Sequence, residues 1–229
     1  DPSCEIGAYV VIKAGVEIGA GTKVDSHTII EENVTIGQKC RIGQQVCISH
    51  ALIGNGVVLL AGCKIGQTGF GFHMDEAGHV SLPQLGRVVI EDGADVGANT
   101  TVDRGAIGDT IIKRGARIDN LVMVGHGAEI GQGTVLVGQV GVAGSTKIGD
   151  YSIAAGQVGI AGHLNIGKGV KIGAQSGLMR DVEDGKTVMG SPAAEFRDWQ
   201  KQTIVMEKLG KEFKNLKKLT KLLEEMNEI

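Results

Sequence analysis

An aliphatic residue recurs every six positions along most of this chain. The first run extends from Ile6 to Ile48 and, after one five-residue step, continues from Ile53 to Ile65; later runs cover residues 90–102 and 112–178. A period of six residues matches neither the 3.6 residues per turn of an α-helix nor the two-residue alternation of a β-strand. Each hexad therefore predicts one short strand and a turn, and three hexads close an eighteen-residue coil. Stacked coils make an all-β solenoid, a parallel β-helix of hexapeptide repeats, which we place at residues 1–188.

Two segments depart from this period. Residues 67–89 form an excursion that holds Phe70 and Phe72, two of the four phenylalanines of the chain. We expect this loop to pack across a substrate pocket or a neighbouring subunit, because a rigid solenoid positions its loops well. After residue 188 the pattern becomes helical: Ser191-Pro192 is a helix-start signal, and apolar residues follow at spacings of three and four from Trp199 to Leu223. Residues 189–229 are therefore predicted as a C-terminal helical extension.

Composition narrows the functional classes. Glycine is abundant, at 37 residues, and aromatic residues make up only 3%, so the core must be aliphatic. A formal charge of −3 gives no basic field for nucleic acid. The chain has no apolar run of membrane-spanning length and no signal peptide, so we expect no stable membrane insertion and a cytoplasmic location. Four cysteines without CxxC spacing are expected to be reduced core or edge residues. Because the chain begins at Asp1 inside a repeat, we expect a preceding segment.

The candidate chemistry lies between Asp119 and Gly144. Gly144 follows His126 by eighteen residues, which is one coil, so the two should stack on neighbouring strands about 4.8 Å apart. A base beside a main-chain N–H is what acyl transfer needs, because one removes a proton and the other stabilises an oxyanion. Asp119, seven residues before His126, is expected to orient the imidazole across a corner. Asp103 and Arg104 are expected to be a solvated surface pair.

Other chemistries find less support in the sequence. His163 follows His126 by 37 residues, two coils plus one position, so the two do not stack in strict register. No third histidine can be placed on their edge, and we predict no metal site, although shared zinc between subunits stays open. No serine or cysteine nucleophile arrangement is present, which favours direct transfer over a covalent intermediate.

Several motifs together carry a resemblance to a known family. The segments are TGFGF (68–72), GRVVIEDGADVGANTTVDRGAIGDT (86–110), IDNLVMVGH (118–126), VAGS (142–145) and GIAGHLNIG (159–167). Together they resemble the UDP-3-O-(3-hydroxyacyl)glucosamine N-acyltransferase family of lipid A and lipopolysaccharide biosynthesis. The resemblance implies a left-handed β-helix, a homotrimer with active sites between subunits, and transfer of an (R)-3-hydroxyacyl group from acyl carrier protein. The acceptor would be the 2-amino group of UDP-3-O-acylglucosamine.

The resemblance also implies roles for single residues. His126 resembles the general base, Asp119 the orienting carboxylate and Gly144 the oxyanion donor. His163 resembles a second active-site histidine near the substrate and the pantetheine arm. Other residues expected to bind substrate are Phe70, Phe72, Asn120 and Gly177, the last by leaving room for a long acyl chain. The acyl donor is carried on the 4'-phosphopantetheine of acyl carrier protein, so no bound cofactor is expected. Acyl carrier protein is acidic, and we expect it to dock on Lys214, Lys217, Lys218 and Lys221.

Three alternatives remain open at the level of sequence. The first is the UDP-N-acetylglucosamine O-acyltransferase of the same pathway, which has the same coil and a similar base. The second is a zinc carbonic anhydrase of the same fold, and the third is a non-catalytic β-helix scaffold. Members of the resembled family carry an N-terminal domain that helps to bind uridine, so nucleotide affinity of this chain is in doubt.

Overall fold

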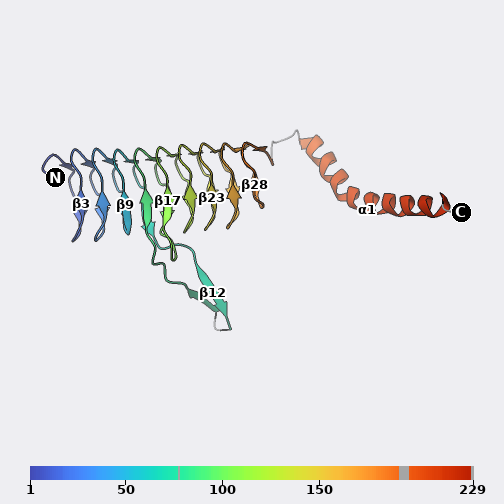
Figure 1. Cartoon of the computed structure of the whole chain (residues 1–229), viewed down its shortest axis with the longest axis horizontal. Helices are drawn as coiled ribbons and strands as arrows, with labels where there is room; N and C mark the ends of the chain where they lie inside the picture. The colour runs from blue at the N-terminus through green and yellow to red at the C-terminus, as the bar shows by residue number, and fades with distance from the viewer. Residues whose placement is uncertain (77, 191–195, 228–229) are drawn as a thin grey trace. The chain divides into compact units, whose positions relative to one another are not determined.

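A computed structural model describes residues 1–76, 78–190 and 196–227 of the chain. The chain divides into two compact units, Asp1–Ser191 and Pro192–Ile229. The first unit is a solenoid of short parallel strands, and the second contains one helix (Figure 1). The expected helix start at Ser191-Pro192 lies outside the described residues.

The solenoid has three parallel sheets, one for each side of the triangular coil. Successive strands of a sheet are eighteen residues apart wherever the period is regular, as in the pairing of Met123 with Gly141. The first sheet contains β1 (Glu5–Ile6), β4 (Lys23–Val24), β7 (Arg41–Ile42), β10 (Val58–Leu59), β15 (Asp95–Val96), β18 (Arg117–Ile118), β21 (Val135–Leu136), β24 (Ile153–Ala154), β27 (Lys171–Ile172) and β29 (Thr187–Val188). The second contains β2 (Val11–Ile12), β5 (Ile29–Ile30), β8 (Cys47–Ile48), β11 (Lys64–Gln67), β16 (Thr101–Asp103), β19 (Met123–Val124), β22 (Gly141–Val142), β25 (Gly159–Ile160) and β28 (Gly177–Leu178). The third contains β3 (Glu17–Ile18), β6 (Thr35–Ile36), β9 (Ala51–Ile53), β14 (Val88–Ile90), β17 (Thr110–Ile112), β20 (Glu129–Ile130), β23 (Lys147–Ile148) and β26 (Asn165–Ile166). This arrangement confirms the predicted parallel β-solenoid.

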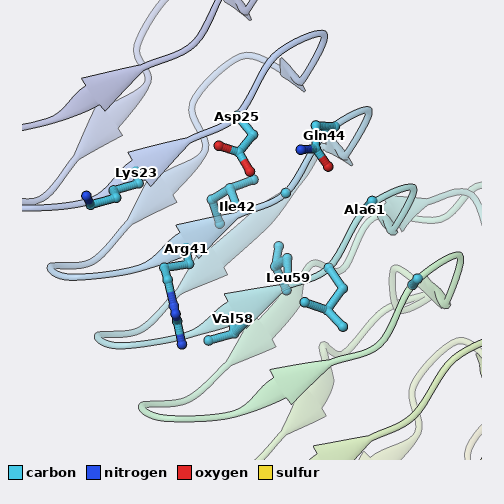
Figure 2. Close-up of a pocket in the computed structure, with 11 residues that line it drawn as sticks. Lys23, Asp25, Arg41, Ile42, Gln44, Val58, Leu59 and Ala61 are labelled. Carbon is cyan, nitrogen blue, oxygen red and sulfur yellow. The ribbon is translucent and has the colours of Figure 1, made fainter.

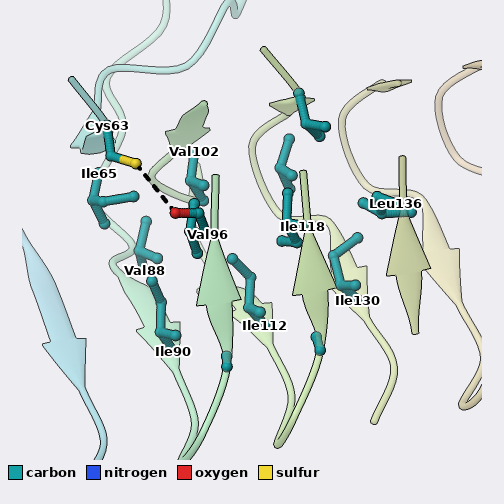
Figure 3. Close-up of a cluster of buried hydrophobic side chains, with 14 of the residues drawn as sticks. Cys63, Ile65, Val88, Ile90, Val96, Val102, Ile112, Ile118, Ile130 and Leu136 are labelled. Atoms are coloured by element: carbon teal, nitrogen blue, oxygen red, sulfur yellow. Dashed lines mark hydrogen bonds between the residues drawn. The ribbon is translucent and has the colours of Figure 1, made fainter. Parts of the chain in front are cut away.

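The core is the column of inward aliphatic side chains that the six-residue period predicts. Ile30, Ile65, Ile112 and Ile130 are all less than 2% exposed. Figure 3 shows part of this column around Ile90 and Ile118, with the Cys63 Sγ 3.6 Å from the carbonyl of Val96. Each fully buried aliphatic side chain contributes about 1.5–3 kcal/mol relative to an exposed one. All four cysteines are free thiols, as expected, and burial raises the pKa of Cys63 to about 11.

Buried hydroxyl groups tie one coil to the next inside this apolar core. The Thr134 hydroxyl donates to the carbonyl of Gly149 at 2.9 Å, and the Thr146 hydroxyl donates to that of Ala161 at 2.8 Å. The Thr100 hydroxyl donates to the Asp119 carbonyl at 2.8 Å. Such pairing removes the cost of burying a polar group, which is about 1–3 kcal/mol when the group is left unpaired.

The excursion leaves the solenoid after β11 and returns at β14. Its outer part is an antiparallel hairpin of β12 (Phe72–Asp75) and β13 (Gly78–Ser81), drawn below the coils in Figure 1. The Phe70 and Phe72 rings meet edge to face with their centroids 5.2 Å apart, and Phe70 is 81% exposed. The hairpin therefore presents aromatic surface outside the coils.

The second unit contains α1 (Phe196–Asn227). Its described apolar side chains, among them Trp199, Leu209 and Phe213, are exposed. Lys217 lies over the Phe213 ring, with its Nζ 5.1 Å from the ring centroid. Lys214 and Lys218 are also exposed, whereas the Lys221 side chain lies outside the described residues. Within the described residues, no helix combines the length and the apolar character that a membrane crossing needs.

The inward column predicts a position-dependent cost of truncation. Ile130→Ala should lower the free energy of unfolding by about 2–5 kcal/mol, because it leaves a cavity between stacked coils. The same change at Ile107, which is 92% exposed, should alter it by less than about 0.5 kcal/mol. Urea unfolding followed by circular dichroism measures both, and equal losses for the two variants would contradict this account of the core.

Candidate active site

His126 and Gly144 occupy the same position on one corner of the solenoid, where the second sheet turns toward the third. This corner, called the His126 corner below, comprises residues 126–127, 144–145 and 162–163. Main-chain hydrogen bonds connect its coils: Ser145 N–H donates to the His126 carbonyl at 2.8 Å, and His163 N–H donates to the Gly144 carbonyl at 3.1 Å. The corner thus brings His126, Gly144 and His163 together on three successive coils.

The imidazole of His126 lies directly over Gly144. A Cβ at Gly144 would be 2.6 Å from the imidazole Cε1, 2.7 Å from Nε2 and 3.0 Å from Nδ1. A side chain at position 144 would therefore displace the imidazole, because the ring edge that carries both nitrogens approaches Gly144 closely. Among the hydrogen bonds of the described residues, none uses the Gly144 N–H as donor. The ring and a free main-chain N–H consequently share one small region, as the coil length predicts.

The excursion packs against the other end of the imidazole. A Cβ at Gly69 would lie 2.7 Å from the His126 Cβ and 3.1 Å from the Gln84 Oε1. Gly69 and Gln84 are both buried, although Phe70 beside them is exposed. His126 therefore lies between the excursion on one side and the next coil on the other.

The expectation that Asp103 is a solvated surface residue is wrong. Asp103 is 5% exposed and is the last residue of β16, and its Oδ1 accepts a hydrogen bond from the Gln67 Nε2 at 2.9 Å. Burial raises the pKa of Asp103, while the hydrogen bond from Gln67 and the charge of His126 lower it. Arg104 does not pair with it; its Nε donates to the carbonyl of Gly86 at 2.6 Å. The buried carboxylate whose charge acts on His126 is therefore Asp103.

Asp119 lies on a different corner, where the first sheet turns toward the second. Its Oδ1 accepts from Asn120 N–H at 2.8 Å and its Oδ2 accepts from Gly138 N–H at 3.0 Å. The Asn120 Oδ1 in turn accepts from Ala98 N–H at 2.7 Å. The structure therefore does not bring Asp119 to His126 within one chain. The physical reason is spacing: seven residues carry the chain through a whole strand of the second sheet.

A smooth strip of glycines runs along the outside of the second sheet. Strand register aligns Met123, Gly141, Gly159 and Gly177 at outward positions of four neighbouring strands. A Cβ at Gly141, Gly159 or Gly177 would meet nothing within 4 Å. The first glycine of this strip, Gly141, lies on β22, which is the neighbour of the β19 strand that leads to His126. The strip leaves an open path across three coils. Gly177 lies at its far end.

Two pockets lie away from the His126 corner. The one in Figure 2, of about 520 Å³, is a hollow on the first sheet that is lined by Arg41, Val58 and Leu59 and, at the adjoining turn, by Gln44. A second, of about 380 Å³, is lined by Asp119 and Asn120. Among the described residues, no group of three His, Cys, Asp or Glu side chains is placed to hold a metal ion.

Spacing alone could not find Asp103 or Gln84. Asp103 ends β16, whose pairing with β11 shifts register, and Gln84 lies in the excursion, where no period applies. The sequence feature that relates to Gln84 is the TGFGF segment, because its glycines at 69 and 71 leave space for the Gln84 amide.

Crowding at Gly144 gives a direct check of this geometry. Gly144→Ala should displace the His126 ring, because its Cβ would lie within 3.0 Å of three ring atoms. The ¹H–¹³C signal of the His126 Cε1 should therefore shift, while the circular dichroism spectrum stays unchanged. Gly159→Ala, whose Cβ would meet nothing within 4 Å, is the matched control and should leave that signal in place. An unmoved signal in Gly144→Ala would refute the stacking.

The chain resembles several curated proteins in sequence. It is 50% identical over 167 residues to the UDP-3-O-acylglucosamine N-acyltransferase of Rickettsia akari (strain Hartford), which is 73% of this chain and 48% of that protein. It is 54% identical over 157 residues to UDP-3-O-acylglucosamine N-acyltransferase 2 of Legionella pneumophila (strain Paris), covering 69% of this chain and 46% of the relative. The chain thus spans about half the length of the curated relatives it matches. No family model matches it.

Solved structures agree on the fold. The UDP-N-acetylglucosamine acyltransferase of Francisella novicida superimposes with a TM-score of 0.75 at 24% identity, over 86% of this chain and 73% of that one. The enzyme of the same name from Campylobacter jejuni gives a TM-score of 0.65 at 21% identity, over 80% of this chain and 68% of its own. The fold is a left-handed parallel β-helix of hexapeptide repeats. The chain is therefore similar in sequence to UDP-3-O-acylglucosamine N-acyltransferases, with identities of 44–54% over about 70% of its own length.

Proposed function

We propose that this chain carries the acyl-transfer centre of an N-acyltransferase that acts on UDP-3-O-acylglucosamine. The donor is an (R)-3-hydroxyacyl group on the phosphopantetheine of acyl carrier protein, and the acceptor is the 2-amino group of the sugar. The observation that supports this most is the imidazole edge of His126 lying over Gly144, whose N–H is free. The names of the curated relatives supply the substrate class.

The reaction needs one base and one oxyanion donor. The acceptor nitrogen attacks the thioester carbonyl, forming a C–N bond, while a nitrogen of His126 takes the amine proton. The Gly144 N–H donates to the oxygen on which negative charge develops. The tetrahedral intermediate then expels the thiolate, which takes the proton from His126, giving an amide and a free thiol. His163, on the same corner two coils on, is proposed to contact the substrate or the pantetheine arm.

The glycine strip supplies a binding surface for the acyl chain. It starts beside the His126 corner and ends at Gly177, and the absence of side chains at Gly141 and Gly159 leaves its floor open. An aliphatic chain that lies along this strip buries apolar surface at about 25 cal/mol per Å². The exposed Phe70 and Phe72 supply further apolar surface for substrate.

Assembly and donor docking belong to the same proposal. Apolar side chains stand outward on the first sheet and its corner, with Leu60 at 46%, Val137 at 36% and Ile153 at 40% exposure. Burial of such residues between three copies supports a homotrimer with its active sites between subunits. The lysines at 214, 217 and 218 on α1 suit docking of the acidic carrier protein.

Removal of the base tests the proposed chemistry. His126→Ala should lower kcat by on the order of 10²–10⁴, because the amine proton then has no acceptor. The assay measures transfer from hydroxyacyl carrier protein to UDP-3-O-acylglucosamine, with UDP-N-acetylglucosamine offered in parallel. The control is His27→Ala, a histidine stacked on Tyr9 far along the chain from this corner. Full activity of His126→Ala would refute the proposal, and preference for UDP-N-acetylglucosamine would indicate O-acyl transfer.

Substitution at the end of the glycine strip tests acyl-chain binding. Gly177→Met should reduce kcat/KM for long acyl donors by on the order of tenfold or more relative to short ones, because the new side chain blocks the strip. Gly108→Met, also at an open position but outside the strip, should leave this ratio unchanged. Unaltered chain-length selectivity in Gly177→Met would place the acyl chain elsewhere.

A further inference from the structure

Helix α1 carries a stripe of exposed apolar side chains along most of its length. Leu209 is 53% exposed, Phe213 56% and Leu216 59%. Soluble proteins rarely leave so long an apolar surface in water, and a helix obtains most of its stability from packing of its apolar face. Because α1 extends over 32 residues, this stripe is a surface that needs a partner to cover it.

The stripe follows a seven-residue period. When the positions of each heptad are lettered a to g, residues at a and d lie on one face of the helix and form the seam of a coiled coil. With residue 199 at position a, six of the eight a and d positions up to residue 223 are apolar. These seam residues are Trp199, Met206, Leu209, Phe213, Leu216 and Leu223. A repeat sustained over more than three heptads is typical of a helix that packs against other helices.

The charges beside the seam suit parallel pairing of identical helices. Glu212 is at position g, and Lys217 is at position e of the next heptad. Parallel pairing in register would place Glu212 of one copy opposite Lys217 of another, as g and e residues of coiled coils pair. The Lys217 Nζ lies 5.1 Å from the centroid of the Phe213 ring, so this charge is at the edge of the seam. Within the described part of one chain, neither Glu212 nor Lys217 forms an ion pair.

The outer face of α1 has a different character. Lys208, Lys214 and Lys218 lie at positions c, b and f, which point away from the seam. An acidic partner suits this outer face, because lysines gather there. The seam has an acid and a base at matching positions instead, so its charges are complementary to those of a second copy of itself. Val205 and Leu219, both at g, widen the seam on one side, which is the pattern of a helix in a bundle.

We propose that α1 pairs in parallel and in register with the α1 helices of other copies of this chain, as a coiled coil. The six seam residues pack against one another, and Glu212 and Lys217 fix the register. The pairing does not depend on the proposed catalysis, and the number of helices follows the proposed homotrimer. Such a coiled coil holds the copies together independently of any contact between their solenoids. Lys214 and Lys218 stay accessible to the proposed carrier protein.

Cysteine cross-linking of the full chain tests the pairing. Leu209→Cys and Leu216→Cys, made singly, should each give a covalent dimer under mild oxidation with diamide, because equal d positions of parallel helices face each other across the seam. Mass spectrometry should find the disulfide between the two substituted positions. Lys218→Cys, also exposed but at position f, is the control. It should give no more dimer than the wild type, whose four free thiols set the background.

Charge reversal tests the register. In the Leu216→Cys chain at low ionic strength, Glu212→Lys should lower the yield of covalent dimer, because two lysines then face each other. Lys217→Glu should lower it as well, because two carboxylates then face each other. The two reversals together restore an opposite pair and should restore the yield. Both side chains are exposed in the single chain, so the melting temperature of the solenoid should stay the same.

Several results would overturn the proposal. Seam variants that form no more dimer than Lys218→Cys would refute the pairing, and a double reversal that fails to restore the yield would refute the register. A disulfide from a seam position to a native thiol would instead assign the stripe to the solenoid. Loss of carrier-protein binding in Leu216→Asp, without any dimer from Leu216→Cys, would make the carrier protein the occupant. Protein that cross-links as expected but transfers no acyl group would refute the proposed function and leave the coiled coil intact.

Discussion

The whole molecule depends on one constraint, the stacking of each inward aliphatic side chain on its counterpart one coil away. Strands of only two or three residues have little stability of their own. They persist because parallel neighbours on both sides and a continuous apolar column fix them, which is how solenoids obtain cooperativity. The same stacking fixes the outward side chains, because a residue's position in the hexapeptide repeat determines which sheet it lies on and which coil along the solenoid axis it belongs to. Functional residues therefore inherit their positions from the core.

The His126 corner illustrates this inheritance. His126, Gly144 and the residue before His163 each fall two positions after an inward aliphatic residue, so they form a column at the turn. The main-chain bonds from Ser145 and His163 hold that column with little freedom. In the proposed reaction this base is preorganised, because neither the ring nor the neighbouring N–H has to be ordered when substrate arrives. A rigid solenoid suits a reaction whose chemistry needs only two well-placed groups.

The regular six-residue period made some positions of the candidate site predictable from the sequence. The positions in irregular segments could not be predicted from it. The stack of His126 on Gly144 followed from one coil of eighteen residues, and the outward register of Gly177 followed from the same arithmetic. Asp103 did not follow, because the step between Val102 and Val124 is four residues longer than a coil. Gln84 lies in an excursion whose path no period determines. For Asp119 the period was regular, but seven residues lead to another corner of the same chain, so its role toward His126 stays a prediction.

The two residues that spacing missed are also those that depart from the way this core treats polar groups. Buried hydroxyls such as Thr134 and Thr146 have hydrogen-bond partners, so the solenoid satisfies its polar atoms where only stability is at stake. The Gln84 oxygen has none, and the Asp103 carboxylate is buried at a cost that raises its pKa. Local rules of this kind are broken in proteins mainly at functional sites. Both departures lie near His126: a Cβ at Gly69 would be 3.1 Å from the Gln84 Oε1 and 3.2 Å from the His126 Cγ, and the charge of His126 lowers the pKa of Asp103. Their position beside His126 supports the proposed function of this corner.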